Sequence, residues 1–238
     1  MSLTLEQQQQ IERQIAAHHH QKYEVDIELA PGETLKQFAV HRNVFRPELT
    51  TSKSLAQFIA SRKQLVYQKN VIDMGSGSGI QGVVMACCGA SAIYFSDISS
   101  AAVENSLDNV RKFALSEKST VVQGNLFESV KGEADLIVFN HPFFPDEPIE
   151  GEPVSAAMLD PGVLIHRFLE EAKTYCRGSI IMPFLHLAGE VNDPGVQAPR
   201  HGLSIIDKFT CEVDNGLQRG RFSIYELKYP GNGSSSVS

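Results

Sequence analysis

The residues of this chain that could do chemistry stand directly after short apolar runs. Asp73 follows the apolar pair Val71–Ile72, and three glycines then occur at alternate positions, Gly75, Gly77 and Gly79. This order predicts a buried strand, a tight turn and the start of a helix. Glycine suits such a turn because it accepts positive φ angles and lets a ligand approach backbone N–H groups. The helix N-terminus adds donors and a partial positive charge, so we expect a ligand site here.

Polar residues also end the later apolar runs. Asp97 follows residues 92–96, Asn125 and Leu126 follow residues 120–123, and Asn140 follows residues 135–139. Helix-compatible segments separate these runs, which is typical of parallel strands joined by helical crossovers. Ligands bind at the carboxyl ends of the strands in such sheets, so we expect these residues to contribute to one site.

The glycine pattern fits two classes of cofactor. Residues 77–82 match G-x-G-x-x-G and Asp97 lies about twenty residues further on, as in nicotinamide-dependent oxidoreductases. An acid at the end of the first strand, Asp73, and the sequence Asn140-His141-Pro142-Phe143 after the fourth strand favour another class. Together these motifs resemble the class I methyltransferases that use S-adenosyl-L-methionine (SAM), over roughly residues 45 to 229.

The resemblance implies a role for each strand-end residue. Asp97 would accept hydrogen bonds from both ribose hydroxyls, and Asp73 would hold the methionine amino group directly or through water. Asn125 and the backbone N–H of Leu126 would bind adenine. The family usually has Asp where Asn125 stands, but an amide carbonyl can also accept from the adenine amino group. The expected cofactor-binding residues are Asp73, Gly75, Ser76, Gly77, Gly79, Asp97, Ile98, Asn125, Leu126 and Asn140.

The sequence at 140–143 resembles the [ND]-P-P-[FYW] motif of the HemK-like, small-domain methyltransferases that act on planar nitrogen. The resemblance implies that Asn140 accepts the N–H bonds of the target amine or amide, that Pro142 holds the turn rigid and that Phe143 stacks on the target. These three are the expected catalytic residues. His141 replaces the first proline. It could serve as a general base at its usual pKa, but we favour a side chain directed away from the methyl group. A non-catalytic SAM-binding module is the alternative raised by this substitution.

The order of elements predicts an α/β fold, a doubly wound and mostly parallel seven-stranded sheet with a helix and hairpin before it. We divide the chain into an N-terminal extension at 1–45, a SAM-binding methyltransferase domain at 46–230 and a disordered tail at 231–238. The last two strands, around 204–213 and 221–229, are expected to form a β-hairpin with its turn at 214–216.

The N-terminal extension differs in pattern from the rest and is expected to be a cap that faces the substrate. Residues 2–23 predict a helix, and residues 25–29 and 35–40 predict a hairpin. The expected apolar contacts of the helix are Leu3, Leu5, Ile11, Ile15 and Ala16. Neighbouring side chains on a helix point about 100° apart, so His18–His20 cannot all face one metal ion, and we expect a solvated surface and no metal site. The helix beginning near Thr50 would close over the methionine end of the cofactor.

The composition and net charge of the chain limit where the protein could reside and which partners it could bind. The 238 residues contain no apolar run long enough to cross a membrane, and the four cysteines lack C-x-x-C spacing, so we expect a cytoplasmic, reduced protein. The formal net charge of −7 and the acids just beyond the motif, from Asp146 to Asp160, disfavour a phosphate-rich partner. We therefore expect a protein or small-molecule methyl acceptor, with an RNA base as the less favoured alternative.

Overall fold

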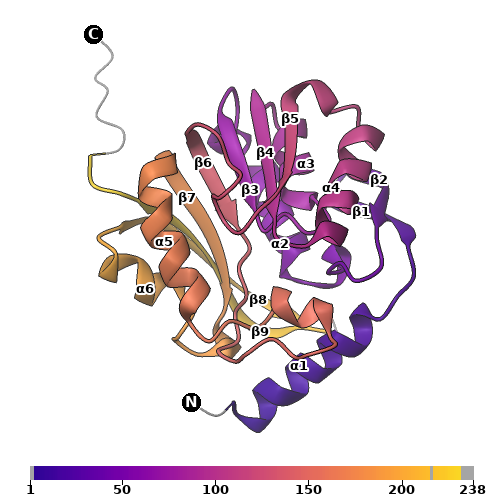
Figure 1. The fold of residues 1–238 in the computed structure, drawn as a ribbon, viewed down its shortest axis with the longest axis vertical. Helices are drawn as coiled ribbons and strands as arrows, with labels where there is room; N and C mark the ends of the chain where they lie inside the picture. Colours follow the sequence, from indigo (N-terminus) through magenta and orange to yellow (C-terminus); the bar gives the residue numbers. More distant parts are fainter. Residues whose placement is uncertain (1–2, 215–216, 232–238) are drawn as a thin grey trace.

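The computed structural model of this chain describes residues 3–214 and 217–231, and within them a seven-stranded sheet is flanked by helices on both faces (Figure 1). The sheet order is β5-β4-β3-β6-β7-β9-β8. Strand β9 is antiparallel to both of its neighbours, β7 and β8, and the other neighbouring pairs are parallel. The expected fold class is therefore confirmed. The strands are β3 Asn70–Met74, β4 Ala92–Asp97, β5 Ser119–Gln123, β6 Ala134–Phe139, β7 Cys176–Leu185, β8 Ser204–Asp214 and β9 Arg219–Lys228.

The helices and the N-terminal hairpin complete the fold. The helices are α1 Leu5–His18, α2 Thr51–Ser61, α3 Ile80–Cys87, α4 Ser100–Lys112, α5 Val163–Tyr175 and α6 Pro194–Arg200. Five 3-10 turns join them in the described ranges, η1 Pro47–Leu49, η2 Lys63–Leu65, η3 Ser116–Lys118, η4 Pro153–Ala157 and η5 His186–Ala188. The hairpin pairs β1 Tyr23–Ala30 with β2 Glu33–Val40, as the alternating pattern predicts. The expected turn at 214–216 and the tail at 231–238 fall largely outside the described residues.

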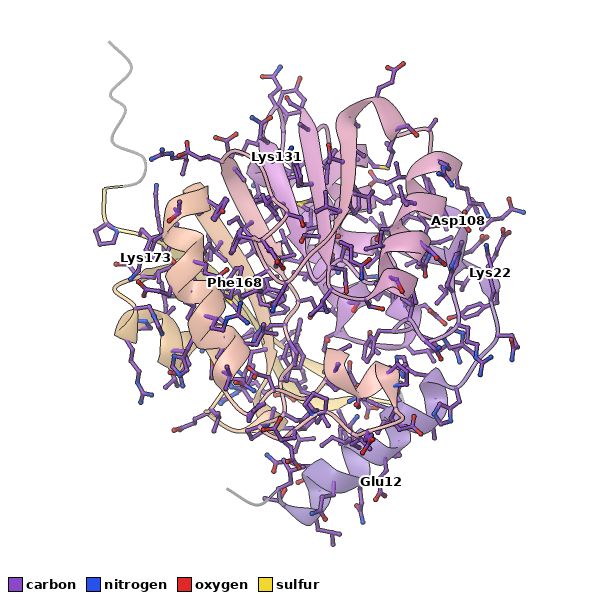
Figure 2. The ribbon with its side chains drawn as sticks, in the orientation of Figure 1. Glu12, Lys22, Asp108, Lys131, Phe168 and Lys173 are labelled. Carbon is purple, nitrogen blue, oxygen red and sulfur yellow. The ribbon has the colours of Figure 1, made fainter. Side chains whose placement is uncertain are left out.

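Alternate residues of the central strands enter two separate cores. Ile137 of β6 packs with α5 and α6 on one face of the sheet, whereas Val138 packs with α2, α3 and α4 on the other. This alternation follows from the period of two in a strand, and it explains why the central strands are apolar on both sides. Phe168 of α5, labelled in Figure 2, packs against Phe139, the last residue of β6, with the ring centroids 4.5 Å apart and the rings tilted by 51°. The α5 core thus fixes the point where the motif at 140–143 begins.

The N-terminal hairpin shares the second core with the rest of the chain. Ile27 of β1 and Phe38 of β2 are buried in the cluster that contains α2 and α3. The amide of Asn109 on α4 bonds both the carbonyl and the N–H of Ala39 at the end of β2. On the surface, Lys22 and Asp108 form an ion pair that joins the α1–β1 connection to α4 (Figure 2). The hairpin is thereby attached beside the glycine turn.

Helix α1 lies across the end of the β8–β9 hairpin (Figure 1), and its buried face is mostly polar. Ile11 is buried as expected, but Leu5 is 69% exposed, so the expectation of an apolar contact there is wrong. The buried polar residues recur every three or four positions and are Gln7, Gln10, Gln14 and His18. A helix places such residues on one face. This face is directed toward the loops that border the site described next.

Candidate cofactor and acceptor site

The carboxyl ends of β3, β4 and β6 border a cavity of about 370 Å³. Within the described residues, every residue expected in the site lines it except Gly79. The other walls come from the segment before α2 and its first residues, from the loop between β6 and α5, from Gln14 of α1 and from Gln218 just before β9. The sheet therefore supplies one end of the cavity, and segments distant in sequence close the other.

The glycine turn has the conformation and the open space that a ligand needs. Gly75, Gly77 and Gly79 have φ angles of +60°, +55° and +80°, in the left-handed region where a side chain is strained. At Gly77 an added Cβ would meet nothing within 4 Å, so its backbone faces open space. At Gly79 it would lie 3.0 Å from Ser106 Oγ. Gly79 thus permits close packing of α4, while Gly77 presents backbone to the cavity.

Two carboxylates hold the turn from the strand ends. Asp73 is 2% exposed and accepts a hydrogen bond from the Gly82 N–H at 2.8 Å. Asp97 accepts from the Gly77 N–H and the Ser99 N–H, each at 2.9 Å. Burial raises the pKa of both carboxyl groups, most strongly at Asp73. A bound cationic amine or a pair of hydroxyls would offset this desolvation of the ionised forms.

The residues expected to bind adenine lie at the end of β5. Leu126 has a φ of +53° and is buried, and its carbonyl accepts from the Ser96 hydroxyl at 3.0 Å. The side-chain oxygen Oδ1 of Asn125 lies 3.5 Å from Nη1 of Arg167 on α5. Ile98 is 64% exposed and lines the same end of the cavity. An apolar side chain and turn backbone here can contact a planar ring.

Asn140 is oriented by the N-terminus of α2. Its side-chain nitrogen donates to Ser52 Oγ at 2.9 Å, which leaves the side-chain carbonyl for another donor. Ser52 is itself buried, and its backbone carbonyl accepts from Gln81 of α3. Thr50 caps α2 through its side chain. The start of α2 therefore fixes the amide that begins the 140–143 motif.

His141 is directed into an aromatic core. It is 2% exposed, its Nε2–H donates to the Asn192 carbonyl at 2.8 Å, and its ring stacks with that of Phe184 at 6.1 Å. Burial lowers its pKa to about 4. The imidazole is therefore neutral near pH 7, with its N–H committed to a backbone carbonyl.

The loop after the motif is held by Asn192 and returns to the cavity. The Asn192 amide donates to the carbonyls of Phe143 and Asp160. Phe143 is 6% exposed, meets His141 edge-on and still lines the cavity. Asp160 is one of the acids expected to face a partner, but it is buried and caps α5 by accepting hydrogen bonds from three backbone N–H groups. The expectation is therefore wrong for this residue. The exposed acids of the loop are Asp146, Glu147 and Glu150.

The expectation that His18–His20 form a solvated surface is wrong for His18. His18 is 1% exposed, stacks at 4.0 Å on Phe45 and donates from Nδ1 to the Gln14 carbonyl. Burial lowers its pKa to about 4. Phe45 lines the cavity, so His18 supports its wall from behind. His19 pairs with Glu152 instead, and His20 with the Val44 carbonyl.

Sequence reasoning missed Gln14 and Gln218 as residues of the site. Both are buried and line the cavity, and they bond each other across 204 positions of sequence. The signal available in the sequence is the spacing of Gln7, Gln14 and His18 on one helical face.

No group of three or more His, Cys, Asp or Glu side chains that could hold a metal is found in residues 3–214 and 217–231. No helix in those same ranges is long and apolar enough to span a membrane.

Comparison with known proteins identifies the family. The model of the methyltransferase small domain matches residues 38–174, more than half of the chain. The chain belongs to the methyltransferase small domain family. This membership agrees with the methyltransferase resemblance and not with the oxidoreductase alternative.

Individual relatives match part of the chain. The ribosomal protein L11 methyltransferase of Pelotomaculum thermopropionicum is 38% identical over 104 residues, which cover 43% of this chain and 33% of that protein. The release factor glutamine methyltransferase of Borreliella burgdorferi is 26% identical over 114 residues, 48% of this chain and 40% of that one. The chain thus aligns with less than half the length of these relatives.

Solved structures share the fold at lower identity. The T. thermophilus 16S rRNA methyltransferase RsmC, solved with AdoMet and guanosine, superposes with a TM-score of 0.61 at 17% identity, over 88% of this chain and 51% of that one. These comparisons support SAM as the cofactor of this small-domain methyltransferase. The open backbone at Gly77 and the buried carboxylates Asp73 and Asp97 fit that cofactor, since its amine is cationic and its ribose carries two hydroxyls.

Proposed function

We propose that this protein transfers a methyl group from SAM to a nitrogen, of an amine or an amide, on a protein or a small molecule. The observation that carries the proposal is the orientation of Asn140. Ser52 holds its side-chain nitrogen, and its carbonyl oxygen is left to accept an N–H in the same cavity as the glycine turn. An acceptor at this point would aim the lone pair of a bound nitrogen toward the cofactor.

The chain's own contribution to the reaction is then mostly positioning. When bound, SAM supplies an electrophilic methyl on a sulfonium that leaves as a neutral thioether. Asn140 would hold the target N–H, and Phe143 would pack against one side of the target. Pro142 would restrict the backbone of the turn between them. Holding two reactants in line can account for a large share of a rate enhancement.

His141 does not act as a general base in this proposal. Its Nε2–H is committed to the Asn192 carbonyl and burial lowers its pKa to about 4, so it would be a weak base. The proton of the methylated nitrogen would leave to solvent after transfer. The substitution of proline by histidine is therefore compatible with an active enzyme and does not require a decayed site.

The acceptor class follows from the cavity mouth and the relatives. Residues of the loop between β6 and α5 line the cavity, and its exposed acids would repel a phosphate backbone. The two relatives described above are by name methyltransferases of a ribosomal protein and of a release factor. We therefore place a protein or small-molecule nitrogen first. An RNA base with an exocyclic amine is the second candidate, because it offers the same N–H to Asn140.

The test is transfer of a tritiated methyl group to extract from cells that lack this protein. Wild-type enzyme should label a fraction that survives ribonuclease and is lost on protease treatment or dialysis. The Asn140→Ala variant should bind S-adenosylhomocysteine like wild type in calorimetry and lose transfer. Asp97→Ala should lose the binding itself. Full transfer by Asn140→Ala would refute the role of the motif, and label lost only to ribonuclease would reverse the order of the candidates.

A further inference from the structure

The buried polar face of α1 consists of Gln7, Gln10, Gln14 and His18. Among the described residues, Gln14 Nε2 and His18 Nε2 on this face lack a hydrogen-bond partner, and of these two residues only Gln14 lines the cavity. Gln7 donates to the Leu187 carbonyl and Gln10 to the Leu217 carbonyl, so both amides fasten the helix to the body. Gln14, one turn further along the same face, is 1% exposed and lines the cavity. Its nitrogen Nε2 has no hydrogen-bond partner among the described residues.

The orientation of the Gln14 amide follows from a backbone donor. The Thr51 N–H can only donate, and it donates to Gln218 Oε1 at 2.6 Å. Gln218 must therefore turn its nitrogen the other way, and that nitrogen donates to Gln14 Oε1 at 3.3 Å. Gln14 in turn presents Nε2 on the side away from Gln218. A rotated Gln14 amide would set two N–H groups against each other.

The same network joins Gln14 to the motif. Thr51, which fixes Gln218, precedes Ser52, and Ser52 holds Asn140. Gln14, Gln218, Ser52 and Asn140 all line the one cavity. A buried N–H donor without a partner is unfavourable, so an acceptor atom supplied by a bound molecule would stabilise it.

We propose that Gln14 is a specificity-determining residue, which donates a hydrogen bond to an acceptor atom of the substrate beside the nitrogen that Asn140 holds. The inference rests on the proposed function and narrows it. A group that offers both an N–H and a neighbouring acceptor, such as a carboxamide or the amidine edge of a base, satisfies both residues. A simple alkyl ammonium has no acceptor, and its charge would face the N–H of Gln14.

Small probes test this pairing directly. Propionamide and propylamine have the same carbon chain, and only the amide carries an acceptor beside its nitrogen; guanosine represents a base. Each is titrated into ¹⁵N-labelled enzyme saturated with S-adenosylhomocysteine. The side-chain NH₂ signal of Gln14 is assigned by its loss in Gln14→Met. We expect propionamide to move this signal, propylamine to leave it unmoved, and Gln14→Met to bind propionamide about three- to tenfold more weakly.

Matched variants separate a substrate contact from a structural role. Gln10→Met makes the same change one turn earlier, at a residue that fastens α1 outside the cavity, and should bind propionamide as wild type does. A response to guanosine alone would assign the acceptor to a base and still support the role of Gln14. The proposal would be overturned if wild type and Gln14→Met bound the responding probe, propionamide or guanosine, with equal affinity, or if neither of these two probes moved the Gln14 signal.

The cofactor provides the remaining check. Weaker S-adenosylhomocysteine binding by Gln14→Met would place Gln14 on the cofactor and overturn the inference, without touching the proposed methyl transfer. Failure of the wild-type enzyme to bind S-adenosylhomocysteine at all would instead refute the proposed function. The two failures are therefore distinguishable in one set of titrations.

Discussion

Protonation of His141 should destabilise the folded protein by an amount that its burial fixes. Burial lowers the pKa of this imidazole from 6.5 to about 4, so the unfolded chain binds the proton more readily than the folded chain. The contribution is absent above pH 6.5 and grows as the pH falls toward 4. The linkage relation gives a loss of unfolding free energy of about 1 kcal/mol at pH 6, about 2 kcal/mol at pH 5 and about 3 kcal/mol at pH 4.

The His141→Phe variant isolates this contribution. Phenylalanine keeps a ring among Phe139, Phe143 and Phe184 but cannot titrate. It also leaves the Asn192 carbonyl without its donor, which should cost about 1–3 kcal/mol at neutral pH. The stability advantage of the wild type should therefore shrink by about 2 kcal/mol between pH 7 and pH 5. His18 and the carboxylates titrate in both proteins, so they cancel in the difference if the sites are independent.

The measurement is urea denaturation of both proteins at half-unit steps from pH 5 to pH 7.5. A difference in unfolding free energy that stays constant over this range would refute the buried, neutral state of His141. The methyl-transfer rate gives an independent readout. A titration near pH 6 to 7 that disappears in His141→Phe would show that this residue is a base after all.

Two further predictions concern the glycine turn and its acids. Gly82→Ala should destabilise the fold by about 1–3 kcal/mol in urea denaturation, because its Cβ would lie 2.0 Å from the buried Phe95 ring. Gly77→Ala should instead weaken S-adenosylhomocysteine binding and cause a smaller loss of stability. A larger stability loss in Gly77→Ala than in Gly82→Ala would contradict these roles. Binding of S-adenosylhomocysteine should also release protons and weaken as the pH falls, since Asp73 and Asp97 have raised pKa values and bind best when ionised; calorimetry at pH 5 in two buffers of different ionisation enthalpy would show no such release if this is wrong.

The sheet end of the site could be predicted from sequence because its signals are local. The strand ending at Asp97 and the turn from Gly75 to Gly79 are each specified by residues within a few positions of one another. Short apolar runs separated by helical patterns then imply parallel strands, which bring the strand ends together. Helix α6 escaped prediction because two prolines, Pro194 and Pro199, interrupt any apolar period in it.

Leu5 is an apolar side chain that stays exposed, whereas the other two errors, at Asp160 and His18, concern polar side chains that the fold buries. In the sequence, Asp160 is one of several loop acids, and only the structure shows that it accepts hydrogen bonds from the first N–H groups of α5. His18 reads as a surface residue, yet Phe45 covers its ring. A composition rule that places polar residues outside cannot anticipate partners that only the tertiary fold provides.

The site residues that can be predicted from local sequence patterns lie inside the family region, and those that depend on contacts distant in sequence lie outside it. The family match ends at residue 174 and begins at residue 38, so it contains Asp73, Asp97 and Asn140 but neither Gln14 nor Gln218. Under the proposed function, the cofactor side would be built by the shared region, and part of the acceptor side by segments outside it. A common methyl donor requires only the cofactor side to stay constant. The acceptor side can change its substrate through a few polar side chains on α1 and the last hairpin, and selectivity should therefore be sought in those segments.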